Sequence, residues 1–208
     1  MIRRIPIFAT LIVIAAVAIM IRFGIWQLGR AGERDAAKAE MIARSSLPGV
    51  EFPYSNPTNP RFAYRRVMAT CDEVRSWEAR GGRSADGTTG WRHIATCVAG
   101  KPNVLFQADM GVSRGPNIQL SWAGGEVIGH AVRAPDNRSL VEKLLRKQVP
   151  RPLMLVAETP APGLAPSRQP DPREEENSSW SYAGQWFLFA LTALAIYSIA
   201  LWKRMRAR

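Results

Sequence analysis

The run IPIFATLIVIAAVAIMI (residues 5–21) decides the fold class, because it has the length of a membrane crossing and contains no charged residue. A helix of this length, at 1.5 Å per residue, spans about 26 Å, slightly less than the hydrocarbon core of a bilayer. It can continue to Trp26 if Arg22 extends toward the lipid headgroups. A second charge-free run, residues 182–202, is long enough for one further crossing.

We therefore expect a membrane α+β protein, in which two transmembrane helices flank a small extracytoplasmic β-rich domain with one short helix. Residues 158–176 are rich in proline and then acidic, which is typical of a tether. The expected segments are an N-terminal transmembrane helix (1–24), an amphipathic helix leaving the membrane (25–46), the β-rich domain (47–157), the tether (158–180), a C-terminal transmembrane helix (181–202) and a basic tail (203–208).

The basic residues beside the two runs predict the orientation. Arg3 and Arg4 precede the first run, and four basic residues follow the second. Short basic flanks stay in the cytoplasm, so we expect both termini to be cytoplasmic and the main domain to be periplasmic. The first run begins too early to leave room for a mitochondrial presequence, which favours a bacterial plasma (inner) membrane. The alternative for residues 1–24, a cleaved signal peptide, is less favoured because the apolar run is longer than a usual signal core.

The formal net charge of +11 does not indicate a nucleic-acid partner. Seven of the 28 basic residues lie beside or just after the two apolar runs or at the chain start, while all 17 acidic residues lie between the runs. The intervening domain therefore keeps 21 basic against 17 acidic residues. Since it has no basic stripe interleaved with aromatic residues, we expect the lipid bilayer as a partner and no nucleic acid.

The domain between the runs carries strand patterns. Alternating or β-branched segments occur at residues 64–74, 91–98, 103–109, 126–133 and 153–157. The glycine-rich segment 79–90 predicts a loop between strands. Ser139-Leu-Val-Glu142 has the spacing of a capping box, which predicts a short helix from there to about Gln148.

The two cysteines, Cys71 and Cys97, both lie between the membrane runs. An exported pair predicts a structural disulfide. Closing a loop of about 26 residues would stabilise the domain by roughly 3 kcal/mol in the chain-entropy model. The alternative is a thiol pair that handles copper or electrons, although the sequence has neither a CxxC spacing nor an adjacent histidine cluster.

Enzymatic motifs are scarce. The sequence contains no GxSxG, no HExxH and no phosphate-binding glycine loop. Its two histidines, His93 and His130, have no second histidine or carboxylate spaced to share a metal ion. We therefore expect no catalytic residue, no metal site and no enzymatic activity.

Polar and aromatic residues gather at the outer edge of both membrane runs. Trp26 and Arg30 are four residues apart and share one helix face. One interpretation is an aromatic belt with extended basic side chains. The other is that the two helices meet here and jointly build a site. The candidate site residues are Trp26, Gln27, Arg30, Tyr182, Gln185 and Trp186.

Four segments resemble the surfeit locus protein family, the cytochrome c oxidase assembly factors. FGIWQLGR (23–30) resembles that family's L-G-x-W-Q-L-x-R hallmark after the first membrane helix, and YRRV (64–67) its aromatic-R-R-V strand. LFQADMGVSR (105–114) lies where the family has a strand ending near R-G-W. SYAGQWFLFALTALAIY (181–197) resembles the family's Y-A-x-x-W-F entry into the second helix. The resemblance spans nearly the whole chain.

The resemblance implies a non-enzymatic assembly factor for haem–copper cytochrome c oxidase, which supports haem a insertion into subunit I. Its partners would be subunit I or its assembly intermediates. The six candidate residues would then line a haem-facing surface between the helices, with Arg30 suited to a propionate and the aromatic rings to the porphyrin face.

Two positions depart from the family pattern. Ser179 stands where the family's N-N-H-L-x-Y-A run has the histidine expected to ligate haem, and serine is a poor axial ligand. Met110-Gly111-Val112 replaces R-G-W. Either another side chain holds haem a, or the protein acts as a scaffold. The alternative function is a membrane-anchored extracytoplasmic ligand-binding or sensor module without a role in oxidase assembly.

Overall fold

The computed structural model describes residues 6–100, 104–136, 138–145 and 149–206. The predictions that concern Arg3, Arg4, Asn103, Gln148 and Arg208 lie outside these residues. The chain divides into two compact units. The helix-pair unit takes the described residues up to Ala39 and from Glu175 onward, and the sheet unit is Glu40–Glu174.

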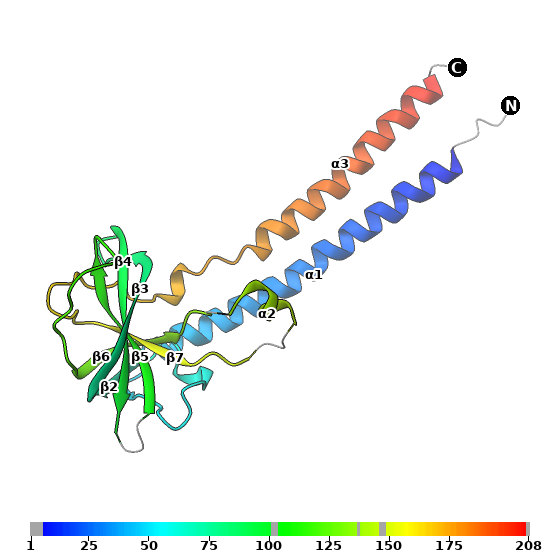
Figure 1. Cartoon of the computed structure of the whole chain (residues 1–208). Coiled ribbons are helices and arrows are strands. Elements are labelled where there is room, and N and C mark those ends of the chain that lie inside the picture. Colours follow the sequence, from blue (N-terminus) through cyan, green and yellow to red (C-terminus); the bar gives the residue numbers. More distant parts are fainter. Residues whose placement is uncertain (1–5, 101–103, 137, 146–148, 207–208) are drawn as a thin grey trace. The chain divides into compact units, whose positions relative to one another are not determined.

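The helix-pair unit consists mainly of α3 (Ser179–Arg206) and of α1 (Ile7–Ser45) up to Ala39, and the two helices lie side by side there (Figure 1). Both are long and apolar enough to cross a membrane, and few side chains of either apolar window are buried. The chain therefore has two candidate membrane spans, at the two places where the sequence predicts them. α1 continues without a break through WQLGR, so the two predicted segments 1–24 and 25–46 belong to one helix within the described residues.

Small residues bring α1 and α3 close together. Gly24 and Ala31 on α1 and Ala183 and Ala190 on α3 are buried. A Cβ atom on Gly24 would lie 2.7 Å from Cζ of Phe187, so a larger residue here would require the Phe187 ring to move. Small residues at such positions let helix backbones approach closely in a membrane, where lipid gives little hydrophobic drive for association.

A seven-stranded sheet forms the second unit, together with two 3₁₀ turns, η1 (Pro60–Phe62) and η2 (Pro172–Glu174), and the helix α2 (Leu140–Leu145). The strand order is β1-β2-β6-β7-β5-β4-β3. The strands are β1 (Val50–Glu51), β2 (Arg66–Cys71), β3 (Glu73–Arg83), β4 (Thr89–Ala99), β5 (Val104–Ser113), β6 (Gly125–Arg133) and β7 (Leu153–Ala157).

The sheet curls until its two sides meet. β2 ends at Cys71 and β3 begins at Glu73, although the two strands stand near opposite ends of the strand order. The single connecting residue, Asp72, donates its backbone N–H to Val98 O of β4 at 2.9 Å. The expected disulfide between Cys71 and Cys97 joins β2 to β4, with 5.2 Å between the Cα atoms. The buried alternate residues of β2 face the core enclosed by this curl.

Two details of the predicted strands are wrong. The segment 64–74 holds two strands with a bend at Asp72, not one strand. The predicted loop 79–90 is mostly ladder, since β3 pairs with β4 as far as Arg83 opposite Thr89, and only residues 84–88 turn. Gly90 allows close pairing of β4 with β5, because a Cβ atom on it would lie 2.5 Å from Ser113 O of the neighbouring strand.

The predicted capping box is confirmed at the start of α2. The Ser139 backbone N–H donates to Glu142 Oε2 at 3.1 Å, and the Glu142 N–H donates to Ser139 Oγ at 3.3 Å. These reciprocal bonds satisfy two backbone donors that a helix start leaves unpaired.

Residues 160–168, which we expected within a tether, pack on the sheet and are called the strap below. Val112 of β5 exchanges backbone hydrogen bonds of 2.7 and 2.9 Å with Ala165, and Ala161 N–H donates to Met110 O at 2.8 Å. The strap therefore extends the sheet unit.

Candidate functional site

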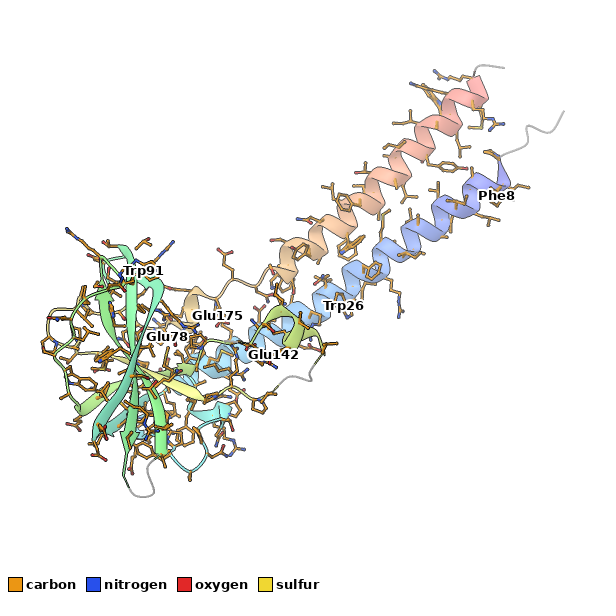
Figure 2. All side chains as sticks on the ribbon, viewed as in Figure 1. Phe8, Trp26, Glu78, Trp91, Glu142 and Glu175 are labelled. Carbon is orange, nitrogen blue, oxygen red and sulfur yellow. A yellow bond between two sulfur atoms is a disulfide. The ribbon has the colours of Figure 1, made fainter. Side chains whose placement is uncertain are left out.

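A small hollow lies between α1 and α3, within the helix-pair unit. Its volume is about 330 Å³, at the lower end of the range of roughly 300–1,000 Å³ for ligand pockets. Trp26 of α1, which Figure 2 labels, is one of its lining residues. We call it the helix-pair hollow, and its lining residues are Trp26, Gln27, Arg30, Arg34, Ser178, Ser179 and Tyr182.

Helical spacing explains which side chains reach the hollow. Gln27, Arg30 and Arg34 follow one another at three- and four-residue steps, so they lie along one face of α1. On α3, Ser179 and Ala183 are four apart and are 2% and 1% exposed. The packed faces of the two helices therefore border the hollow directly.

A hydrogen-bonded clamp fixes the start of α3 against α1. Asn177 Nδ2 donates to Ala31 O and to Asp35 Oδ1, both at 2.8 Å. Trp180 Nε1 donates to the other oxygen of Asp35 at 2.9 Å. Asn177 Oδ1 also accepts from the Ser179 N–H at 3.3 Å, in the manner of a helix N-cap. We call these side chains the Asn177–Asp35 clamp, which no residue pattern in the sequence indicated.

The hollow contains two cations whose present contacts are weak. Arg30 Nη1 lies 2.7 Å from Glu33 Oε2, but both side chains are exposed to solvent. Exposed pairs of this kind contribute at most about 1 kcal/mol. Arg34 Nη1 donates to Ser178 Oγ at 3.3 Å. Both guanidinium groups can therefore exchange these contacts for a carboxylate ligand.

The structure brings together four of the six candidate residues: Trp26, Gln27, Arg30 and Tyr182 line the hollow. Trp186 lies deeper and stacks on Phe23 of α1, with 4.9 Å between ring centroids. Gln185 is exposed and is not a lining residue, because it lies off the packed α3 face of Ala183, Trp186 and Ala190.

Arg34 and Ser178 line the hollow without having been predicted. The spacing of Arg34, four residues after Arg30 on the same helix face, was a signal that could have identified it. Ser178 gave no such signal, because its place depends on how the chain enters α3.

The lining matches only part of a haem. Its arginines suit carboxylates and its aromatic rings suit a flat ring face. Ser179 is a lining residue at the position of the family's histidine, and of the side-chain types that ligate haem iron the described lining contains only Tyr182. No imidazole is among these lining residues.

Both histidines belong to the sheet unit and have partners there. His93 Nε2 lies 2.7 Å from Ser113 Oγ, and burial lowers the pKa of His93, which favours a neutral ring. His130 Nδ1 lies 3.1 Å from Gln169 Oε1. Within the described ranges, no group of three or more His, Cys, Asp or Glu residues could hold a metal ion.

The cysteines are unsuited to copper handling in this state. Cys71 and Cys97 are 1% and 0% exposed, and their sulfur atoms are bonded to each other. A thiolate ligand would require reduction of the bond and opening of the core.

Residues 14–115 match the SURF1 family, which confirms the resemblance to the surfeit locus proteins. The matched region includes Trp26, Gln27 and Arg30, whereas the α3 side of the hollow lies beyond it. No curated protein matches the chain. The SURF1 family is associated with cytochrome oxidase assembly.

Proposed function

Because this protein has a SURF1-family region, we propose that it is an assembly factor for haem–copper cytochrome c oxidase that supports haem a insertion into subunit I. The family association and the two candidate membrane helices support a membrane-bound role in oxidase assembly. In this proposal the protein resides in a bacterial plasma membrane, with both termini cytoplasmic and the sheet unit periplasmic.

The helix-pair hollow is the observation that carries the proposal. It combines Arg30 and Arg34 with Trp26 and Tyr182 at the end of an apolar helix pair. Haem a has an apolar ring with an acidic edge, and this lining offers aromatic surface beside two carboxylate-binding groups. A partner with the same two-sided chemistry is expected to bind here.

The small volume of the hollow favours transient contact over storage. About 330 Å³ accommodates only part of a large macrocycle, so the remainder would stay accessible to the receiving subunit. Arg30 and Arg34 would hold the acidic edge, Trp26 would cover part of the ring, and Ser179 would leave the iron to another ligand. Haem a is cargo here, and its redox chemistry belongs to the completed oxidase.

Complementation of a deletion strain tests the assembly role. We expect deletion to lower oxidase activity and the haem a absorbance of membranes, and the wild-type chain to restore both. The Arg30→Ala/Arg34→Ala variant should restore haem a several-fold less at equal protein level. Glu33→Gln is the matched control, because it removes the partner of Arg30 and leaves the guanidinium in place. Normal oxidase in the deletion strain would contradict the assembly role itself.

An optical spectrum of the purified chain tests the haem contact separately. In a host that makes haem a, we expect a weak, substoichiometric band for the wild type and a stronger one for Ser179→His. A stoichiometric band in the wild type that persists in Tyr182→Phe would show that a ligand outside the hollow holds the iron. If neither protein shows a haem band but the wild type still complements the deletion strain, only a scaffold role remains.

A further inference from the structure

A second, larger cavity lies in the sheet unit and belongs to neither the helix-pair hollow nor the core. Its volume is about 1160 Å³. Five cationic side chains from separate segments line it, and we call it the basic cavity: they are Arg61 on η1, Arg133 at the end of β6, Arg138, Lys143 on α2, and Arg151 before β7.

The charge of the basic cavity is not balanced by its described lining. Asp136 is the one carboxylate among the described lining residues, and Arg138 binds both of its oxygens, through Nε at 3.0 Å and Nη2 at 2.9 Å. This pairing holds the pKa of Asp136 well below its usual range, so the carboxylate stays ionised. None of the other four cations forms an ion pair with a carboxylate of the described lining, although Lys143 donates to the backbone oxygen of Asp136 at 3.4 Å and its charge acts on that carboxylate. Positive charges gathered around one cavity raise its affinity for anions.

One cationic nitrogen is also buried without a partner. Nη1 of Arg138 has no hydrogen-bond partner among the described residues, although it is shielded from solvent. An unpaired buried donor is unfavourable. Asp136 binds the other two nitrogens of this guanidinium, so an anion would gain Nη1 as a donor only by displacing the groups that now cover it.

We propose that the basic cavity binds a phosphate-bearing anion. A phosphate group offers several charged oxygens that match guanidinium forks. The four cations that form no ion pair carry more positive charge than a ligand with a single carboxylate would neutralise. Asn56 and Thr58 add uncharged polar groups to the lining. The phosphate would come from a soluble phosphate compound or from a phospholipid headgroup, since both carry the same chemistry.

Calorimetric titration with inorganic pyrophosphate tests the proposal on the full chain in phosphatidylcholine nanodiscs. We expect saturable binding that weakens at least tenfold in Arg133→Gln/Arg151→Gln. The matched control is Arg75→Gln/Arg114→Gln, which removes the same charge from exposed positions outside the lining and should change the affinity less than twofold. Equal weakening in both double variants would overturn the proposal, because the anion would then respond only to net charge.

Flotation with phosphatidylglycerol vesicles distinguishes the two sources. If vesicles capture the wild type but not the cavity double variant, and the wild type does not bind pyrophosphate, the phosphate belongs to a lipid headgroup. Pyrophosphate binding without capture assigns it to a soluble compound. Neither binding nor capture by the wild type would overturn the proposal. If the double variant unfolds, the exposed single change Arg61→Glu replaces it, with Arg114→Glu as its control. Neither readout involves the oxidase, so the result is independent of the proposed assembly role.

Discussion

At the scale of single residues, Asp109 shows how tertiary contacts override a sequence pattern. The sequence places it at the end of a predicted strand, where a charged residue is ordinarily exposed. In β5 it is 0% exposed and accepts from Ser167 Oγ at 2.7 Å, the Gly111 N–H at 3.2 Å and Arg92 Nη1 at 3.4 Å. Burial raises the pKa of this carboxyl, while the three donors act against the rise.

The buried carboxyl should make stability depend on pH. Because its folded-state pKa lies above its unfolded value, its stabilising contribution is complete below the unfolded pKa and is lost as pH rises through the folded pKa. Asp109→Asn should remove this loss, so the free energy of unfolding should fall less between acidic and neutral pH than in the wild type. Denaturant titrations over that range, followed by tryptophan fluorescence, measure the difference, and parallel curves would contradict it.

Removing the acceptor altogether should be more damaging. Asp109→Ala leaves the donors of Ser167, Gly111 and Arg92 without their buried acceptor, and we expect a loss of about 3 kcal/mol in the free energy of unfolding at neutral pH. The same titrations measure it. A loss no larger than that of Asp109→Asn would show that the donors find other partners.

At the scale of elements, the strap explains a glycine in the strand that resembles the family's R-G-W region. Gly111 has φ +129°, and a Cβ atom there would lie 2.7 Å from Ala165 O of the strap. Gly111→Ala should therefore destabilise the sheet unit by about 1–3 kcal/mol. Gly115→Ala is the control, because nothing lies within 4 Å of its Cβ position. The thermal unfolding midpoints of the two variants measure the difference in stability, and equal midpoints would contradict the role of the strap.

The disulfide should stabilise the curl of the sheet, since it joins β2 to β4 across a separation of 26 residues. In the chain-entropy model, we expect Cys71→Ser/Cys97→Ser to lose roughly 3 kcal/mol. Chemical unfolding of the variant and of the wild type with and without dithiothreitol measures the effect. The reduced wild type should behave like the variant, and an unchanged stability on reduction would show that packing alone holds the two strands.

At the scale of the whole molecule, the pairing of α1 with α3 is antiparallel. Thr10 contacts Tyr197, Phe23 stacks on Trp186, and Asn177 binds Ala31. The start of α1 and the end of α3 therefore lie on the same side of the helix pair. The two ends would therefore face the same compartment, as the expected orientation requires, and the compartment itself stays a prediction.

Cysteine labelling checks this topology. A Cys introduced by Arg114→Cys should react with a membrane-impermeant maleimide in intact spheroplasts, whereas one introduced by Lys203→Cys should react only after the membrane is opened. The native pair is bonded and should not interfere. Labelling of the Lys203→Cys variant in intact spheroplasts would contradict a cytoplasmic C-terminus.

The sequence by itself determined the two apolar helices, the capped start of α2, the disulfide partners and the positions of most strands. Each of these depends on a local property: the length of a charge-free run, a residue spacing or an alternation along the chain. Segment 79–90 shows the limit of such reasoning, because glycine composition alone does not distinguish a loop from strands whose neighbours approach closely.

Only the tertiary structure decided how the sheet curls, how the strap packs and which residues share a site. Arg34 joins the helix-pair hollow and Gln185 does not, because membership depends on the rotation of each helix about its axis. The basic cavity likewise collects cations from positions 61 to 151, which no local pattern connects. Such groupings arise when packing brings distant segments together, and that information is not contained in any single stretch of the chain.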